Sequence, residues 1–363
     1  MLESNLSRIR VGALSNLSAF SSWMHGVTAS PRRLNLALQG GGAHGAFTWG
    51  VLDALLEDPR FDFEGLSGSS AGAMNAVIFA NGWMLGGRDG ARQALFDFWT
   101  EIGKQMPSAM VMQSDDDAFS LTPASKLLVK WAGYFSPSQL NPFDLNPLRD
   151  LLSRKVDFEQ LRMRSPFKLF IGTTQANTGK LRLFRESELN VDVLLASACL
   201  PMIHHAVEIE GEPYWDGGYS ANPAVFPLFF ECTCSDVLLV LLSPLKREGT
   251  PRTLEEIESR IINLGFNTNF MREMQMFFEM TEYSSRGSLK LGKLDKRIKD
   301  IRFHMIDTSH LDNMQRNETK LLAHGPFLEM LRGQGRECSS AWLEDKSDGI
   351  GKRSTVDLKQ YFC

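Results

Sequence analysis

The pattern of apolar and polar positions between residues 34 and 82 predicts two successive strand–turn–helix units. Leu34–Leu38 is a short, largely apolar run that is typical of a buried parallel strand. Apolar residues then recur at helical spacing from Phe47 to Leu55, which indicates an amphipathic helix. In the second unit a short strand ends at Gly65–Leu66, and the small, apolar stretch Ala71–Ala80 begins a buried helix.

Similar patterns predict further elements along the rest of the chain. The predicted helices are residues 91–104, a helix that begins at Asn146–Pro147, and residues 191–198, 253–282 and 321–331; the predicted strands are residues 167–173, 180–185 and 237–242 and one at Phe303. The apolar stripe of residues 253–282 is expected to pack in the core, and the alternative is a surface that faces a membrane or another subunit. The stripe contains Ile257, Ile261, Leu264, Phe266, Phe270, Met274, Phe277 and Phe278. The polar remainder of the chain, to Cys363, is expected to pack late or to fray.

The first strand and helix are joined by a glycine-rich loop, Gly40-x-Gly42-x-x-Gly45. A strand, a glycine turn and a helix N-terminus bring backbone N–H groups together at the positive end of a helix dipole, which makes an anion site. The anion could be a pyrophosphate, with Glu64 as the acid that binds a ribose. It could equally be the oxyanion of an acyl intermediate.

The second strand and helix are joined by Gly68-x-Ser70-x-Gly72, which predicts that Ser70 lies on a nucleophile elbow. Glycine is needed two residues before and after such a serine, because the backbones nearly touch there. A nicotinamide-binding unit needs no second elbow, whereas a serine hydrolase needs both a nucleophile and donors for the charge it creates. The pair of motifs therefore favours a serine acyl hydrolase.

The serine needs a base, and the sequence offers two kinds of partner. Seven histidines are present: His25, His44, His204, His205, His304, His310 and His324. His304 lies in an alternating run that is typical of a strand, and for each late histidine a surface or core role is the simpler interpretation. The other partner is Asp216, which follows a predicted strand and precedes Gly217 and Gly218; alone it could be an ordinary turn residue.

Four motifs in this order resemble the patatin-like phospholipases. They are the glycine loop, the G-x-S-x-G elbow, the Ala-Ser-x-x-x-Pro segment Ala196–Pro201 and the distal Asp-Gly-Gly that begins at Asp216. The resemblance runs from about residue 34 to the strand at residues 237–242, and more loosely through the C-terminal helices. It is consistent with the fold we expect, an α/β three-layer α/β/α sandwich around a mainly parallel central sheet, with additional C-terminal helices.

The resemblance also implies a mechanism and a substrate class. Ser70 matches the family nucleophile and Asp216 the family general base, so that the catalytic dyad contains no histidine. The matching site residues are Gly40, Gly41, Gly42, Ala43, His44 and Gly45 in the oxyanion loop, Gly68, Ala71 and Gly72 in the elbow, and Gly217 and Gly218 in the Asp-Gly-Gly motif. The implied activity is hydrolysis of carboxylic esters of phospholipids or other acyl lipids, without a metal or an organic cofactor.

Two features of this implied site depend on charge. The family loop usually carries Arg or Lys where this chain has His44, so we expect any charge at this position to depend on pH. An aspartate with its ordinary pKa of about 3.9 is a weak base for a serine proton at neutral pH. Burial near Tyr214 and Trp215 would raise the pKa of Asp216.

Composition sets outer limits on function. A net charge of −4 gives the chain no basic field that would attract nucleic acid. Five cysteines without metal-ligand spacing suggest a reduced, cytoplasmic environment. The sequence contains no run of the ~20 apolar residues that a transmembrane helix needs, and residues 1–20 lack the apolar centre of a secretory signal.

We expect the following division of the chain. Residues 1–33 form a basic leader that could be flexible or amphipathic, residues 34–245 a catalytic domain, residues 246–340 a helical region packed on that domain, and residues 341–363 a tail. Residues 106–143, rich in methionine, aromatic residues and proline, are the candidate lid over an acyl-chain channel. We expect peripheral contact with a membrane surface. The alternatives are a Ser-His-Asp esterase or acyltransferase that uses a late histidine, and a non-catalytic lipid- or nucleotide-binding module.

Overall fold

The computed structural model describes residues 31–114, 119–247, 249–286 and 292–363. Among these residues, eight strands form one sheet in the order β10-β9-β1-β2-β5-β8-β7, with β6 also paired to β5. The parallel part consists of β10 (Arg302–Ile306), β9 (Asp236–Val240), β1 (Arg32–Leu38), β2 (Phe61–Ser69) and β5 (Lys168–Gln175). Antiparallel pairings add β6 (Leu181–Arg185), β8 (Glu212–Asp216) and β7 (Val207–Ile209).

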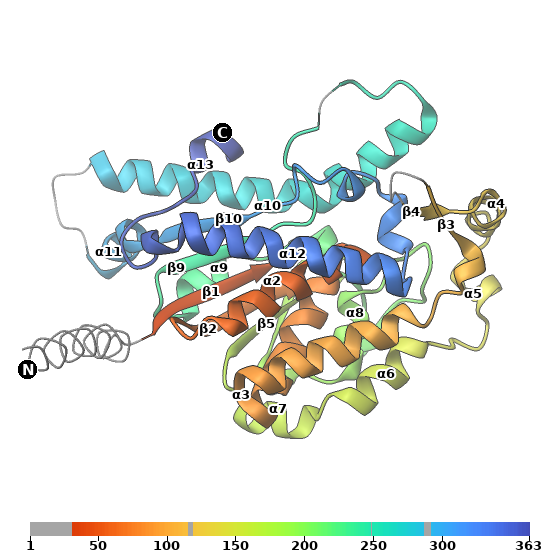
Figure 1. Cartoon of the computed structure of the whole chain (residues 1–363), viewed down its shortest axis with the longest axis horizontal. Coiled ribbons are helices and arrows are strands. Elements are labelled where there is room, and N and C mark those ends of the chain that lie inside the picture. The colour runs from red at the N-terminus through yellow and green to blue at the C-terminus, as the bar shows by residue number, and fades with distance from the viewer. Residues whose placement is uncertain (1–30, 115–118, 248, 287–291) are drawn as a thin grey trace, which may run out of the picture.

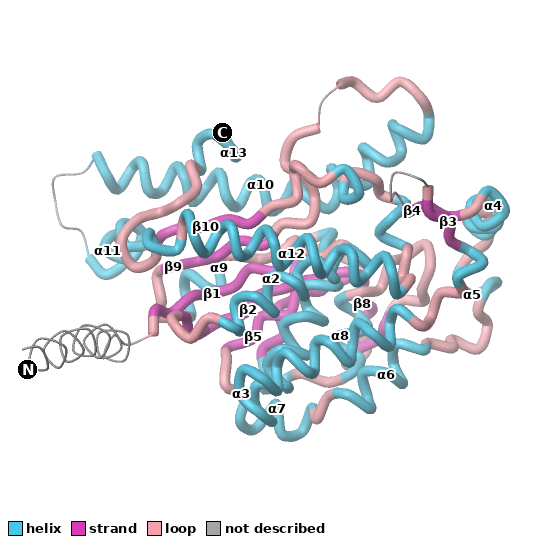
Figure 2. Tube along the Cα trace, viewed as in Figure 1, coloured by secondary structure: helices cyan, strands magenta, loops and turns pink. Residues whose placement is uncertain are grey.

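Helices cover both faces of this sheet (Figures 1 and 2). One face carries α2 (Gly45–Glu57), α3 (Ala71–Gly103), α6 (Pro147–Lys155), α7 (Phe158–Arg164), α8 (Val191–Ser197) and α12 (Gly325–Asp345). The other face carries α9 (Phe226–Glu231), α10 (Leu254–Arg286), α11 (Gly292–Asp300) and α13 (Leu358–Phe362). The predicted three-layer α/β/α sandwich with a mainly parallel sheet is therefore confirmed.

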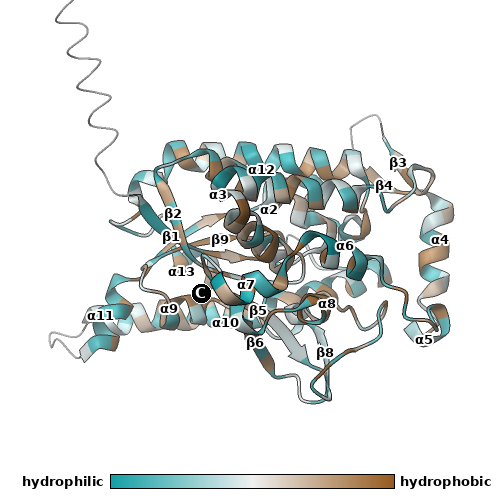
Figure 3. Cartoon of the chain, turned by 90° about the horizontal axis from the view of Figure 1, so that it is seen from below, coloured by the Kyte–Doolittle hydropathy of each residue, from teal (hydrophilic) through white to brown (hydrophobic). Residues whose placement is uncertain are grey.

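The central strands are apolar because helices bury both faces of the sheet. In β9, Leu238 and Val240 face the core beneath α2 and α3, whereas Val237 and Leu239 face the second core beneath α9 and α10. A strand that is buried on both faces is apolar at every position and shows no alternation. Figure 3 shows the result, with hydrophobic residues concentrated on the central strands and on the helix faces that pack against them.

Two boundaries differ from the predictions around the elbow. The strand before Ser70 does not end at Gly65–Leu66 but continues to Ser69, because β1 pairs with it as far as Gly68 and β5 pairs with it from Gly65 to Ser69. The two helices predicted at residues 71–80 and 91–104 are the two halves of α3. Non-helical backbone angles at Gly86 and Gly87 produce a kink between them.

The prediction that the whole apolar stripe of α10 packs in the core is wrong for its first part. Phe270 and Phe277 are buried, and the Phe277 ring lies against Phe229 of α9 and Phe303 of β10. Ile261 and Leu264 are exposed instead, at 62% and 57%. The core contacts of the stripe begin at Phe270, so only the second half of α10 reaches the sheet.

The C-terminal part of the chain is more ordered than its polar composition indicates. The helix predicted at residues 321–331 begins at Gly325 and continues to Asp345, along α2. The end of the chain, expected to pack late or to fray, is packed: Leu358 and Phe362 of α13 are buried in the second core, and the Phe362 ring lies against Phe270. Two apolar residues four positions apart, on one face of α13, thus anchor the segment.

Parts of two predicted regions lie outside the described residues. The leader, residues 1–33, is described only from residue 31, and Arg32 and Arg33 already belong to β1. The candidate lid, residues 106–143, contains the antiparallel pair β3 (Val111–Gln113) and β4 (Phe119–Leu121) and the helices α4 (Pro123–Ala132) and α5 (Pro137–Leu140). Its acidic residues 115–117 lie outside the described residues.

The close contact of α12 with α2 generates a test of the fold. A side chain at Gly335 would collide with the carbonyl oxygen of Phe47 in α2, whereas Gly333 in the same helix has no atom within 4 Å of an added Cβ. We expect Gly335→Ala to destabilise the protein by about 1–3 kcal/mol, because the helices must move apart. Gly333→Ala, the matched control, should be neutral or stabilising by up to about 1 kcal/mol through helix propensity.

Chemical denaturation measures both free energies of unfolding. Equal stabilities for the two alanine variants would contradict the described packing of α12 on α2.

Candidate active site

Ser70 lies in the turn between β2 and α3, and its backbone adopts a rare conformation. Its φ of 54° and ψ of −124° lie in a region that residues other than glycine avoid. Such strain costs about 1–3 kcal/mol and persists only where the surrounding structure enforces it. The side chain is half-buried, and the turn has the geometry that the G-x-S-x-G spacing predicts.

The neighbouring glycines enforce this turn by close backbone approach. A Cβ atom on Gly68 would lie 2.5 Å from the carbonyl carbon of Gly72, and one on Gly72 would collide with the carbonyl oxygen of Leu38. Real Cβ atoms do not approach that closely. The steric requirement for glycine on both sides of Ser70 is therefore present in the structure.

The Ala-Ser-x-x-x-Pro segment holds the same turn from the other side. The Ser70 N–H donates to the carbonyl oxygen of Ser197 at 3.1 Å and to the Ser197 hydroxyl oxygen at 3.0 Å. The Ser197 hydroxyl in turn donates to the carbonyl oxygen of Gly172 at 2.7 Å. The turn at Ser70 is thus tied through Ser197 to the neighbouring strand β5.

Asp216 reaches this region through the register of three strands. Ser69 at the end of β2 is paired with Gly172 of β5, and the next β5 residue, Thr173, is paired with Asp216 at the end of β8. Gly172 has no side chain that would separate Ser69 from Asp216, and a Cβ atom on Gly172 would lie 2.6 Å from Ser69 Oγ. The sheet therefore brings together two residues that are 146 positions apart in the sequence.

The Asp216 carboxyl group is almost completely buried, with only 1% of the residue exposed. Burial raises its pKa to about 7, while a hydrogen bond from the Gly218 N–H (2.7 Å) and the nearby Ser70 side chain oppose the rise. No ion pair involves Asp216 among the described residues. A carboxyl group in this environment changes its protonation state near neutral pH and interacts with the Ser70 hydroxyl.

The glycine loop lies against Ser70, but the structure changes which of its amides are available. An added Cβ on Gly40 would lie 2.8 Å from Ser70 Cβ. The Gly40 N–H donates to Asn222 Oδ1 at 2.7 Å, so this amide, expected to bind an oxyanion, is already engaged. Within the described residues, no hydrogen bond is present from the amides of Gly41 and Gly42.

The later part of the loop has a structural role. The amides of His44 and Gly45 donate to carbonyl oxygens within the loop itself, and a side chain on Gly42 would collide with the Lys320 carbonyl oxygen. Ala43 is buried. Asn222 was missed by the sequence analysis, although it follows the Asp-Gly-Gly motif closely; its signal, Asn-Pro, also marks ordinary turns.

The expectation that His44 carries a pH-dependent charge is wrong. His44 is fully buried, and its pKa is lowered to about 3, first by burial and then by the positive charges of Lys320 and Arg247. Its Nε2 lies 2.8 Å from the Thr319 hydroxyl oxygen. The ring is neutral near pH 7, and the positive charge near the loop comes from two residues far along the chain that no motif marks.

His304 lies away from Ser70 and is occupied elsewhere. It belongs to β10, which β9 and β1 separate from β2. Its Nε2 lies 3.0 Å from Asp236 Oδ1 and its Nδ1 lies 2.8 Å from the Thr355 hydroxyl oxygen. This is a buried structural histidine, and His25 lies outside the described residues.

Glu64, the candidate ribose acid, is likewise engaged. Its carboxylate accepts hydrogen bonds from the amides of Thr233 (2.6 Å) and Cys234 (2.7 Å). These bonds and the positive charge of Lys168 lower the pKa of Glu64, although partial burial opposes the shift. The carboxylate holds the segment before β9 and does not extend over the glycine loop.

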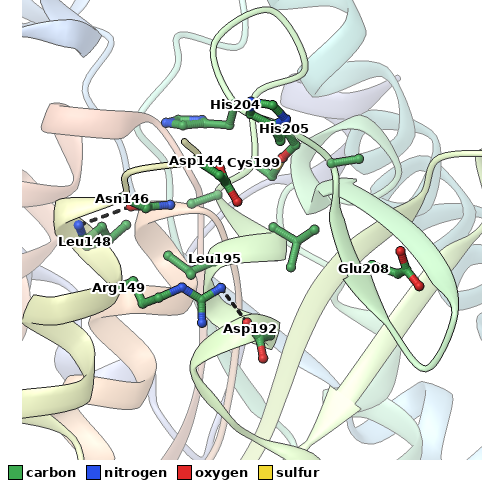
Figure 4. Close-up of a pocket in the computed structure, with 13 residues that line it drawn as sticks. Asp144, Asn146, Leu148, Arg149, Asp192, Leu195, Cys199, His204, His205 and Glu208 are labelled. Carbon is green, nitrogen blue, oxygen red and sulfur yellow. Dashed lines mark hydrogen bonds and ion pairs between the residues drawn. The ribbon is translucent and has the colours of Figure 1, made fainter. Parts of the chain in front are cut away.

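A polar cavity of about 270 Å³ lies behind the Ala-Ser-x-x-x-Pro segment (Figure 4). Cys199 forms part of its wall, and the Cys199 carbonyl oxygen accepts the Asp216 N–H at 2.8 Å. Figure 4 shows the Arg149–Asp192 ion pair at one side of the cavity and His204 and His205 at the other. The cavity therefore borders the segment that positions both Ser70 and Asp216.

Two other kinds of site are absent from the described residues. No group of three or more His, Cys, Asp or Glu side chains is placed to hold a metal ion. None of the described helices combines the length and apolar character needed to cross a bilayer.

Comparison with known proteins bears on the whole region. A family model described as patatin-like phospholipase matches residues 36–229, which contain all four motifs. No curated protein matches the chain. The crystal structure of VipD from Legionella pneumophila is similar over 85% of this chain and 67% of that chain, with a TM-score of 0.33 and 14% sequence identity.

The burial of Asp216 generates a test based on pH and stability. The pKa of its carboxyl group is about 7 in the folded state and ordinarily 3.8, so this group's contribution to stability is lost as pH rises through that window. Asp216→Asn stays neutral and escapes the loss. At about pH 8 the variant should be more stable than the native protein by up to a few kcal/mol, at about 1.4 kcal/mol per pKa unit.

The difference should shrink toward zero near pH 4, which thermal denaturation at both pH values can measure. Asp312→Asn, which removes an exposed carboxylate, controls for the change in net charge. A stability difference that does not change with pH would contradict the described burial.

Proposed function

The chain belongs to the patatin-like phospholipase family, and we propose on this premise that it hydrolyses a carboxylic ester of a lipid through an acyl-enzyme on Ser70. The observation that carries the proposal is the interaction of the buried Asp216 carboxyl group with the Ser70 side chain at a strained turn. Members of this family are typically lipid acyl hydrolases.

In the proposed first step, Asp216 is the general base. With a pKa of about 7, roughly half of the molecules hold it as a carboxylate near neutral pH, and its basicity is far above that of an ordinary aspartate. It accepts the Ser70 proton as Ser70 Oγ attacks the ester carbonyl carbon. The carbonyl electron pair moves to oxygen and gives a tetrahedral oxyanion.

The oxyanion needs hydrogen-bond donors that are not already used. The amides of Gly41 and Gly42 are the proposed donors, because the Gly40 amide is bound to Asn222. The N-terminus of α3, directly after Ser70, adds a favourable dipole. Loss of one such donor typically lowers the rate by about 10²–10³.

The remaining steps return the enzyme to its starting state. Protonated Asp216 donates its proton to the leaving alcohol as the ester bond breaks, which leaves the acyl group on Ser70. Asp216 then takes a proton from water as the water oxygen attacks the acyl carbon. The bond from the acyl carbon to Ser70 Oγ breaks, Asp216 returns the proton to Ser70 Oγ, and the carboxylic acid leaves. Ser197 and Asn222 are positioning residues, since they hold the elbow and the glycine loop.

Access of a lipid to this site is the proposed role of residues 106–143. This segment exposes large apolar side chains, including Trp131 (57%) and Tyr134 (79%). Apolar surface of this kind on a segment between two catalytic-core elements favours a lid that contacts the acyl chains of a lipid surface. Peripheral contact with a membrane belongs to the same proposal.

Labelling with a fluorophosphonate tests the proposed nucleophile, because this reagent modifies only an activated serine. We expect native protein to be labelled and Ser70→Ala to be inert while remaining folded. Asp216→Asn should lower kcat/KM for a soluble ester by about 10²–10⁴, the usual contribution of a general base. In the native protein kcat/KM should rise with pH through an apparent pKa of about 7, as Asp216 loses its proton.

His304→Gln, which can keep hydrogen bonds to Asp236 and Thr355, is the control for a histidine-dependent mechanism and should retain activity. Labelling of Ser70→Ala, or full activity of Asp216→Asn, would contradict the proposed dyad.

A further inference from the structure

A second cavity, of about 410 Å³, lies between α10 and the segment that follows β9. Arg247, Arg260 and Arg272 line it, and Phe362 of α13 closes one side. Among the described residues that line the cavity, none is acidic. The cavity is therefore strongly cationic, although the chain as a whole is acidic.

Two hydrogen-bond donors in this lining have no partner among the described residues. They are Arg247 Nη2 and Asn263 Nδ2, and both atoms are buried. Buried donors of folded proteins are almost always satisfied, so two unpaired donors in one cavity indicate a missing acceptor. An arginine and an amide are suitable donors for a phosphate group.

The positive charges of this region are also uncompensated. In the part of the chain that the structure describes, no carboxylate forms an ion pair with Arg247, Arg260 or Arg272. Glu256, one turn before Arg260, is near enough for the arginine to lower its pKa, but its carboxylate accepts hydrogen bonds from the backbone at the start of α10.

Lys320 lies behind the cavity wall and adds to this charge. Its Nζ is 3.4 Å from Asn263 Oδ1 and 3.3 Å from Ser243 Oγ. Burial and the charge of Arg247 lower the pKa of Lys320 to about 8. An anion in the cavity would reduce the mutual repulsion of these cations.

The cavity is connected to the glycine loop by side-chain hydrogen bonds. Asn267, which lines the cavity, accepts a hydrogen bond from Gln39 at 3.2 Å, and Gln39 directly precedes Gly40. The backbone of Lys320 lies against Gly42. A group bound in this cavity would therefore lie beside the loop that we propose to bind the oxyanion.

The rest of the lining is apolar, which indicates the source of the anion. Leu264 is 57% exposed, and Leu245 and Met271 also contribute to the cavity. Ile261, on the exposed part of α10, extends the apolar surface. A free phosphate ion would gain nothing from these side chains, whereas a phosphate carried by a lipid would place apolar atoms against them.

We propose that this cavity binds the phosphate of an anionic phospholipid and thereby selects the substrate of the Ser70 site. The inference rests on the proposed function and specifies its substrate class. Three arginines that form no ion pair within the described residues favour a headgroup with net negative charge over a zwitterionic one, whose ammonium group they would repel.

Substrate discrimination is the first test. Native protein, Arg247→Gln and Arg260→Gln are assayed on phosphatidylglycerol and on diacylglycerol with the same acyl chains, both in neutral detergent micelles. Each variant should lose about tenfold or more in kcat/KM on phosphatidylglycerol, as expected for loss of a charged hydrogen bond, and little on diacylglycerol. Arg353→Gln, an exposed arginine outside the cavity, is the matched control and should behave as the native protein.

Equal losses on both substrates, or no loss on phosphatidylglycerol, would overturn the inference. Fluorophosphonate labelling of the arginine variants should be unchanged, and loss of labelling together with loss of thermal stability would identify a folding defect. In that case Arg247→Lys, which keeps the charge, should recover phosphatidylglycerol hydrolysis; failure to recover it would count against the inference.

Vesicle binding separates this inference from the proposed function, because it needs no hydrolysis. Ser70→Ala should bind phosphatidylcholine vesicles that contain phosphatidylglycerol more tightly than vesicles of phosphatidylcholine alone. Ser70→Ala combined with Arg247→Gln should lose this preference. If native protein hydrolyses no ester but the preference depends on Arg247, the proposed function fails and the anion site stands. If native protein hydrolyses esters but shows no such preference, the anion site fails and the proposed function stands.

Inorganic phosphate distinguishes the two sources of the anion. It should compete only weakly with phosphatidylglycerol vesicles for Ser70→Ala, because it cannot contact the apolar part of the cavity. Binding of inorganic phosphate as tight as that of the vesicles would contradict a lipid ligand.

Discussion

The rest of this site depends on the burial of the Asp216 carboxyl group, which has no positively charged partner among the described residues. Water would stabilise the ionised form of Asp216, and its exclusion raises the pKa of the carboxyl group toward neutrality. The same burial requires very close packing, which Gly172 and Gly217 permit because they have no side chains. A cation beside Asp216 would remove the basicity that the proposed mechanism needs. The positive charges of Lys320 and Arg247 instead lie near His44 on the other side of the glycine loop.

The geometry around Ser70 comes from three segments that each constrain the others. The elbow is strained, and it is held by the close approach of Gly68 to Gly72 and by hydrogen bonds to Ser197. Asn222 holds the glycine loop through the Gly40 amide, which leaves the next two amides unengaged. The site is consequently built from backbone contacts more than from side chains.

The elements that the sequence predicts well are those determined by local pattern. Leu34–Leu38 is apolar at nearly every position because both faces of the sheet are covered, and the glycines around Ser70 leave few alternatives to a tight turn. The pairing of Ser70 with Asp216 was accessible only through resemblance, because the register of β2, β5 and β8 that joins them is not visible in either motif.

The failures of prediction have one physical cause, which is that burial and long-range contacts are not encoded locally. His44 would be titratable in water, but the fold buries it beside two cations. Ile261 and Leu264 continue the stripe of Phe270, yet the sheet does not extend far enough to cover them. Two distant residues act on the glycine loop. Asn222 holds Gly40 from 182 residues further along the chain, and Lys320 lies against Gly42 from 278 residues further along.

The most direct measurement of the central claim is an infrared titration of the Asp216 carboxyl group, taken as the difference between native protein and Asp216→Asn. We expect the band of the protonated Asp216 carboxyl group to persist well above pH 4 and to be replaced by the carboxylate band with a midpoint near pH 7. A midpoint near 4, the ordinary value for aspartate, would show that the group is hydrated and would contradict its proposed role as the base for Ser70.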